Sequence, residues 1–158
     1  MEEIIENLLN GFGFRYNVFD ENPNKKAWLI NLQLKNGAVR VIIEYFPQNL
    51  VVSIYSVFAI NIPEPKRKAV AEYITRANYG LLLGNFEMDF NDGEVRFKNS
   101  YALDDTFPHS EEVLRRNFVV NVEMMDKYLP GMMAVVYGNA IPEEMILKTE
   151  TASNPLMN

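Results

Sequence analysis

The segment FEMDFNDGEVRFKNSYAL, residues 86–103, decides the fold of this chain. Asp92-Gly93 at its centre is typical of a two-residue hairpin loop, because both residues tolerate the positive φ angles of a type I′ turn. This loop predicts the strand pairs Phe90 with Val95, Asp89 with Arg96, Met88 with Phe97 and Glu87 with Lys98. One face of the hairpin is then apolar and the other carries opposite charges, and a slip by one residue would bury those charges.

A second hairpin is predicted upstream, at Asn36-Gly37. The same pairing rule matches Leu34 with Val39, Leu32 with Val41, Ile30 with Ile43 and Trp28 with Tyr45. A further turn at residues 47–49 leads to a third apolar strand, residues 50–58. The sequence therefore predicts a three-stranded antiparallel meander ahead of the hairpin of residues 86–103.

The meander has a second face that is also partly apolar. The side chains that alternate onto this face are Ile42, Phe46, Val51, Tyr55 and Val57. Exposed apolar patches of that size are often interfaces. We therefore expect the C-terminal region or another copy of the chain to cover this face, and we take these five residues as candidate protein-binding residues.

Three helices are predicted around the strands. The first begins behind Glu2 and Glu3, and the second follows Pro63. The third begins with Ser110 as its N-cap, and a kink or a break is expected at Pro130. Its apolar stripe contains Leu114, Phe118, Val122, Met125, Leu129, Met132 and Val136. The predicted fold class is α+β: a helix, a three-stranded antiparallel meander, a helix, a β-hairpin and a long C-terminal helix.

The length of 158 residues and the hydrophobic content of 48% suit a single domain. No linker or change of composition divides the chain. We expect residues 1–138 to form the α+β domain and residues 139–158 to form a short extension. Within that extension, residues 142–148 have the pattern of one or two helical turns, and residues 149–158 that of a flexible tail.

The charge and the residue content exclude several classes of function. A net charge of −6 disfavours nucleic-acid binding, which needs clustered Lys and Arg. No apolar run approaches the roughly 20 residues of a membrane span, and the N-terminus lacks the positive charge of a signal peptide. Cysteine is absent. We therefore expect a cytoplasmic protein without membrane contact, disulfides or a cofactor.

Candidate catalytic and metal-binding residues are few. His109 is the only histidine, so a histidine-based metal cluster is excluded and any nucleophile–His–acid triad would have to use this residue. A loop position before the third helix is the favoured interpretation of His109. The acidic cluster of residues 87–94 lacks the glycine position of an EF-hand, and Arg96 and Lys98 balance its charge, so solvated ion pairs are favoured over calcium.

Two features could serve binding. Lys66-Arg67-Lys68 lies in the first turn of the second helix, where the helix dipole disfavours cations; a solvated helix start is preferred over an anion or partner contact. The C-terminal region is rich in methionine, a flexible side chain that suits adaptable protein-binding surfaces. Core packing explains most of these methionines. Met124 and Met133 lie off the apolar stripe and are added to the candidate protein-binding residues.

Several segments of the sequence resemble those of a known family. The segments ITRANYG (74–80), GNFEMD (84–89), DGEVR (92–96), SEEVL (110–114) and DKYLP (126–130), followed by Tyr137-Gly138, are similar to the YbjN family, described as a "putative bacterial sensory transduction regulator". The resemblance implies a fold like that of type III secretion chaperones. It also implies a surface for another polypeptide or a second subunit. None of the shared positions is catalytic.

Two functions are compatible with the sequence. The first is a non-enzymatic protein-binding or regulatory module, in which the second face of the sheet and the methionine-bearing helix hold a partner protein or a second copy. The second is a small hydrolase or ligand-sensing domain with carboxylates such as Glu44 or Asp89 in a pocket. The first needs no residue that the chain lacks. A deep polar pocket around two acids would favour the second.

Overall fold

Six antiparallel strands form a single sheet in the computed structural model, which describes residues 1–104 and 110–151. The order across the sheet is β1-β2-β3-β4-β6-β5. The strands are β1 (Tyr16–Asn22), β2 (Lys25–Gln33), β3 (Ala38–Phe46), β4 (Val51–Phe58), β5 (Asn85–Met88) and β6 (Val95–Ala102). The longest strands lie at the centre of the sheet, and the short β5 forms one edge.

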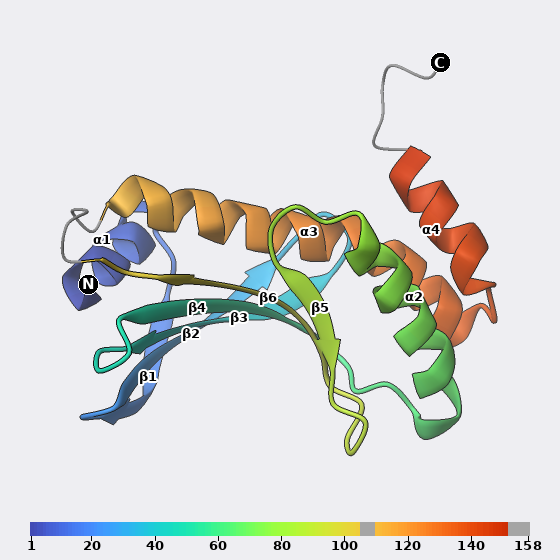
Figure 1. The fold of residues 1–158 in the computed structure, drawn as a ribbon, viewed down its shortest axis with the longest axis horizontal. Helices are drawn as coiled ribbons and strands as arrows, with labels where there is room; N and C mark the ends of the chain where they lie inside the picture. The colour runs from blue at the N-terminus through green and yellow to red at the C-terminus, as the bar shows by residue number, and fades with distance from the viewer. Residues whose placement is uncertain (105–109, 152–158) are drawn as a thin grey trace.

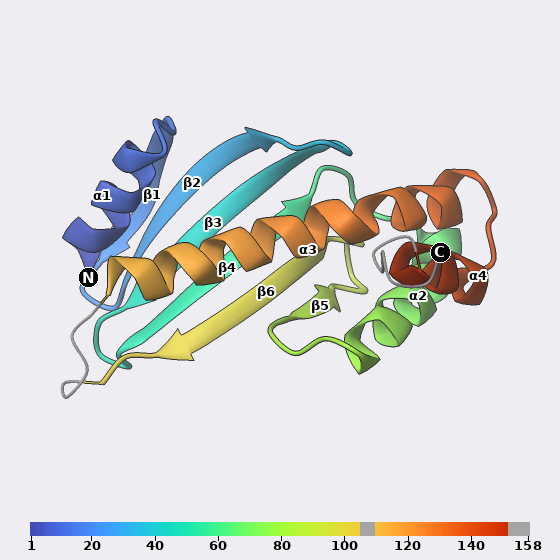
Figure 2. The same ribbon diagram turned by 90° about the horizontal axis from the view of Figure 1, so that it is seen from above.

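Helices lie over one side of the sheet and beyond one of its ends (Figure 1). They are α1 (Glu2–Gly11), the short 3₁₀ helix η1 (Glu64–Lys66), α2 (Arg67–Tyr79), α3 (Glu111–Tyr137) and α4 (Pro142–Thr151). Helices α1 and α3 pack over the sheet, whereas α2 and α4 gather around the C-terminal half of α3 (Figures 1 and 2). The molecule therefore has two layers, with one face of the sheet left without a helix among the described residues.

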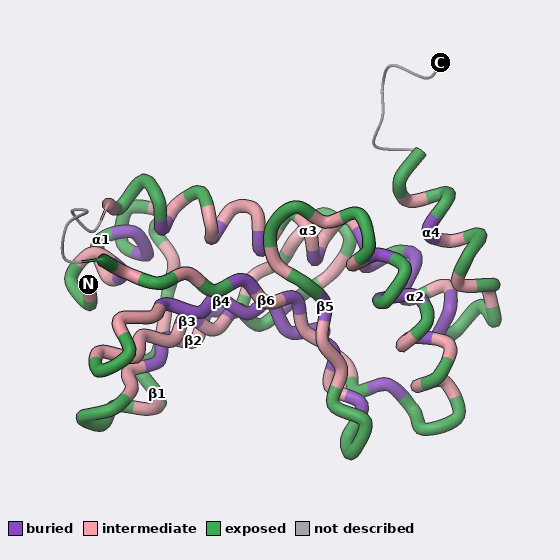
Figure 3. Tube along the Cα trace, viewed as in Figure 1, coloured by how far each residue is buried: buried purple, intermediate pink, exposed green. Residues whose placement is uncertain are grey.

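The core lies between the sheet and α3. Alternate residues of the central strands enter it, as do all members of the predicted stripe of α3 except Val122, which is only partly buried (Figure 3). Ser110 caps α3 as expected, because its hydroxyl accepts hydrogen bonds from the backbone N–H groups of Glu112 and Val113. Helix α3 therefore begins directly after Ser110, whose side chain accepts hydrogen bonds from the first turn.

The predicted α+β class and the order of its elements are confirmed. Strand β1 was not predicted. Most of its side chains are exposed, so its sequence lacks the apolar alternation that identifies a half-buried strand. Helix α4 is longer than the one or two turns expected, and it packs on α2 and α3 with Ile146 buried. The predicted tail begins at residue 149, but α4 continues to Thr151; residues 152–158 and His109 lie outside the described residues.

The predicted register of the β5–β6 hairpin is wrong by two residues. Met88 pairs with Val95 rather than with Phe97, and Asp89 and Glu94 close a four-residue loop. The shift of two keeps the side chains of the paired residues on their predicted faces, because the strand repeat is two. Phe90, predicted to face Val95, instead lies in the loop and is 56% exposed. Contacts from outside the hairpin fix the longer loop: the guanidinium of Arg67 donates to the backbone carbonyl of Phe90 at 2.8 Å.

The first hairpin shows the same offset. Trp28 pairs with Ile43 rather than with Tyr45, and the backbone N–H of Leu34 donates to the carbonyl of Gly37. The turn is therefore one residue earlier than Asn36-Gly37. A contact with α3 fixes the position of this turn, because Asp126 accepts hydrogen bonds from the backbone N–H and the side-chain amide of Asn36.

Helix α3 is not broken at Pro130, although a kink or a break was expected. A proline inside a helix leaves the carbonyl four residues earlier without its usual donor. That carbonyl belongs to Asp126, and the amide of Asn36 donates to it at 3.0 Å. The contact between α3 and the β2–β3 turn thus satisfies the group that Pro130 leaves free.

Candidate functional site

The face of the sheet opposite the helices is the first candidate site, and we call it the open face. Cross-strand pairs Ile42–Tyr55 and Phe46–Val51 place four of the predicted binding residues on it, and Val57 lies beside them, opposite Arg40. None of the helices in the described part of the chain lies over this face (Figure 1). The alternation of the sequence therefore assigned these side chains to the correct face.

Charged side chains cover the middle of the open face. Tyr55 and Val57 are only 9% and 1% exposed, although neither belongs to the core beneath the helices. The guanidinium of Arg96 lies 4.7 Å from the centre of the Tyr55 ring, a cation–π contact, and the ammonium of Lys98 lies at 5.8 Å. Ile42, Phe46 and Val51 are half-buried. The bare apolar area is therefore smaller than the sequence indicated.

These charges form a chain of ion pairs across three strands and the hairpin loop. Glu94 lies between Arg40 and Arg96, with N–O distances of 3.9 Å to each. Arg96 also pairs with Glu87 at 2.9 Å, and Glu87 pairs with Lys98 at 3.6 Å. The opposite charges on this face of the hairpin could be predicted from the sequence. The contribution of Arg40 could not, because β3 becomes a neighbour of the hairpin only through β4.

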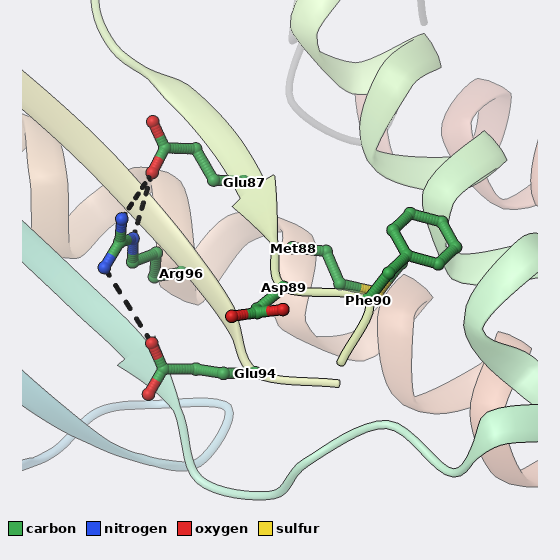
Figure 4. A pocket seen from close by; sticks show the side chains of 6 residues that line it. All are labelled: Glu87, Met88, Asp89, Phe90, Glu94 and Arg96. Carbon is green, nitrogen blue, oxygen red and sulfur yellow. Dashed lines mark hydrogen bonds and ion pairs between the residues drawn. The ribbon is translucent and has the colours of Figure 1, made fainter. Parts of the chain in front are cut away.

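The β5–β6 hairpin frames a cavity of about 340 Å³ at the middle members of this chain of charges (Figure 4). Glu87, Asp89, Glu94 and Arg96 supply its polar lining. The carboxylate of Asp89 accepts hydrogen bonds from the backbone N–H and the side-chain amide of Asn91, at 2.8 and 2.9 Å. Asp89 thus shapes the hairpin loop.

The pKa of Glu87 indicates how this cavity behaves chemically. Burial raises the pKa, but the hydrogen bond from Arg96 and the nearby charges of Lys98 and Arg96 outweigh burial, and the net shift is downward. The carboxyl group of Glu87 is therefore ionised at neutral pH, whereas a general acid needs a raised pKa. In the part of the chain that the structure describes, no group of three or more His, Cys, Asp or Glu side chains could hold a metal ion.

The two carboxylates named for the enzymatic alternative are not brought together in one pocket. Asp89 lines the hairpin cavity, whereas Glu44 is not part of its lining and pairs with Lys25 at 3.2 Å. A pair of acids with separated pKa values is the arrangement expected of a carboxylate-based hydrolase. The geometry of these two residues does not supply it.

The methionine candidates lie on the other layer of the molecule. Met124 is half-buried against the core, and Met133 is 38% exposed, both on α3. Because α3 covers the opposite side of the sheet, these side chains do not join the open face in one surface (Figure 1). The basic residue Arg67 is also accounted for, since it holds the hairpin loop.

Sequence reasoning missed a group of exposed apolar side chains between α2 and β5. Tyr79 and Leu82 are each 98% exposed, and Leu83 is 56% exposed. The available signal was the run of three leucines, residues 81–83, enclosed by Gly80 and Gly84. Such a run is too short for a helix and is bounded by turn residues, which favours an exposed loop.

Comparison with known proteins identifies the family of this chain. No curated protein matches the chain. No helix among the described residues has the length and apolar character needed to cross a membrane.

The sequence model of the YbjN family, described as "Putative bacterial sensory transduction regulator", matches residues 2–132. Because this match spans most of the chain, from α1 through the greater part of α3, the protein belongs to the YbjN family.

Proposed function

We propose that this chain is a non-enzymatic regulatory protein that acts by binding another polypeptide, with the open face as the binding surface. One observation carries the proposal: a complete face of a six-stranded sheet has no helix over it in the described part of the chain. The description of the family as a regulator supports the same role. A chaperone-like use of the face, in which it holds an unfolded segment, is the finer form of this proposal.

The charges of the open face favour a second copy of the chain as its first candidate occupant. The face carries both signs, with Arg40 and Arg96 close to Glu87 and Glu94. A two-fold axis places a surface opposite itself, so a face with both signs can set unlike charges against each other. The half-buried Ile42 and Phe46 would supply apolar contact around these pairs.

The enzymatic alternative has weaker support. A carboxylate-based hydrolase or ligand sensor would use the hairpin cavity, where Glu87 has a lowered pKa and Asp89 shapes the loop. Both carboxylates are thus committed to contacts within the hairpin. We therefore place binding ahead of catalysis.

Light scattering at high micromolar concentration tests the proposal. The unmutated chain should form a dimer, and the double variant Ile42→Glu/Phe46→Glu should be a monomer, because each new carboxylate would be desolvated at the interface. Tyr55 is left intact because Arg96 and Lys98 pack on it. Met133→Glu, an exposed position on α3, is the matched control and should leave the dimer unchanged.

The same variants separate the possible occupants. If the unmutated chain is a monomer, the second copy is wrong, and affinity capture from native lysate with mass spectrometry should give a partner that Ile42→Glu/Phe46→Glu loses. A partner or a dimer lost in Met133→Glu and kept in the double variant would show that the open face is not the binding surface.

A further inference from the structure

Strand β6 has an open edge along its C-terminal half. β5 pairs with β6 only from Val95 to Lys98, whereas β4 pairs with it as far as Ala102. Between residues 99 and 102, β6 therefore has a described neighbour on the β4 side alone. Figure 2 shows β5 beside the beginning of β6, whereas the part that carries the arrowhead has β4 on one side and no described strand on the other.

The backbone groups on this edge point away from β4. The N–H of Leu103 donates to the carbonyl of Leu50, which continues the β4 ladder. In an antiparallel strand, the N–H and C=O of one residue point to the same side, and successive residues alternate. Ser100 and Ala102 thus direct their N–H and C=O groups to the open edge, and both residues are exposed. Unpaired strand edges are ready templates for another strand.

An apolar groove of about 370 Å³ runs beside this edge, between the loop that follows α2 and the beginning of α3. Its lining includes Leu83, Tyr101, Val113 and Val120. The exposed Leu82 lies next to Leu83 on the same loop. The open edge and the groove are adjacent, since Ser100 and Tyr101 contribute to the lining of the groove.

Two polar side chains that line the groove lack partners among the described residues. The hydroxyl of Tyr101 is buried and has no hydrogen-bond partner within the described residues. Burial raises the pKa of this phenol to about 12, so the hydroxyl stays protonated at neutral pH and can donate. Arg116 is exposed at the groove, and the described part of the chain offers it no ion pair. A carboxylate would satisfy the guanidinium of Arg116.

We propose that the edge of β6 at residues 99–102, with the adjacent groove, binds an extended segment of a partner protein that carries apolar side chains and one acidic residue. The segment adds a strand to the sheet, in line with β5. Ser100 and Ala102 pair with its backbone, an apolar side chain enters the groove, and its carboxylate pairs with Arg116. Four residues of β6 span about 13 Å, so the bound strand is short.

This inference rests on the proposed function only in taking a polypeptide as the ligand, because it uses a different surface. The test is selection from a display library of random heptapeptides on the unmutated chain. The affinities of the selected peptides are then measured by fluorescence anisotropy. Ala102→Pro removes one edge N–H and leaves the β4 ladder intact, whereas Ala102→Val keeps the N–H and is its matched control. Arg116→Glu is an exposed change that tests the acidic contact without a threat to folding.

The selected peptides should alternate apolar and polar residues and contain Asp or Glu. Their affinity should fall at least tenfold in Ala102→Pro and in Arg116→Glu and stay within about threefold in Ala102→Val. Failure to select any peptide, or equal affinity for Arg116→Glu, would overturn the edge site. Peptides lost in Ile42→Glu/Phe46→Glu but kept in Ala102→Pro would also overturn it, while supporting the open face as the binding surface.

Discussion

Replacement of Asn121 by leucine should destabilise the protein strongly, because Asn121 ties α3 to the centre of the sheet. Its side chain is fully buried. The side-chain oxygen accepts a hydrogen bond from the hydroxyl of Ser56 at 2.6 Å. The amide nitrogen donates to the side-chain oxygen of Asn99 at 2.7 Å and to the carbonyl of Ile54 at 2.9 Å.

The magnitude follows from the groups that lose their partners. Leucine has the same branched skeleton and the same number of side-chain heavy atoms as asparagine, but it is larger and has no polar atom, so the hydroxyl of Ser56 and the side-chain oxygen of Asn99 are left buried without this partner. Each such group costs about 1–3 kcal/mol. Burial of the added apolar surface returns about 1–2 kcal/mol. The two groups together cost about 2–6 kcal/mol, so after the apolar return the expected net loss of unfolding free energy is centred on about 2–3 kcal/mol.

Urea denaturation monitored by the fluorescence of Trp28, the only tryptophan, measures this loss. The informative control is Ser56→Ala. In the unmutated protein it removes a hydrogen bond, whereas in the Asn121→Leu background it removes an unpaired hydroxyl and should restore about 1 kcal/mol. A loss below about 1 kcal/mol for Asn121→Leu, or a further loss on adding Ser56→Ala, would refute the reasoning.

Three further predictions concern the hairpin, the helices and the ion pairs. Gly93→Val should lower the unfolding free energy by more than about 3 kcal/mol in urea denaturation. Gly93 has a φ of +84°, and a Cβ there would lie 2.2 Å from the carbonyl oxygen of Ile62. An unchanged stability would contradict the observed conformation of the hairpin loop. Gly131→Ala should lower the melting temperature, since its Cβ would lie 2.2 Å from the hydroxyl oxygen of Tyr73, whereas Gly11→Ala, which meets nothing within 4 Å, should not. The carboxyl group of Glu87 has a pKa below its ordinary value of 4.5, so its ion pairs stabilise the fold fully above pH 4.5 and lose this effect as the pH falls through the folded-state pKa. Glu87→Gln should therefore lower the melting temperature at about pH 7 but not at about pH 2. An equal effect at both pH values would count against the ion pairs.

Which face each strand residue occupies could be predicted from sequence, but the pairing register could not. Alternation has a period of two, so it assigned Tyr55 and Ile43 to opposite faces without knowledge of the turns. Turn chemistry alone placed both hairpin loops, and both registers were wrong by two residues. The loops are set by contacts distant in sequence, from Arg67 to one and from Asp126 to the other.

The candidate site could be predicted in part. The apolar residues of the open face were identified because each strand displays its own pattern, but the cover of Arg96 over Tyr55 depends on β4 lying beside β6, a pairing of strands far apart in sequence. The separation of Met133 from the open face likewise depends on which side of the sheet α3 packs. The pattern within each element reveals its apolar side but does not tell which elements share a surface.

The sequence by itself determined the α+β class, the order of the predicted elements, the inward side of each of them and the family, because these follow from local periodicity and from motifs within single segments. Only the tertiary structure decided the hairpin registers, the pairing of β4 with β6 and the open edge at residues 99–102. Those features depend on the free energy of contacts between segments distant in sequence, which no local pattern contains.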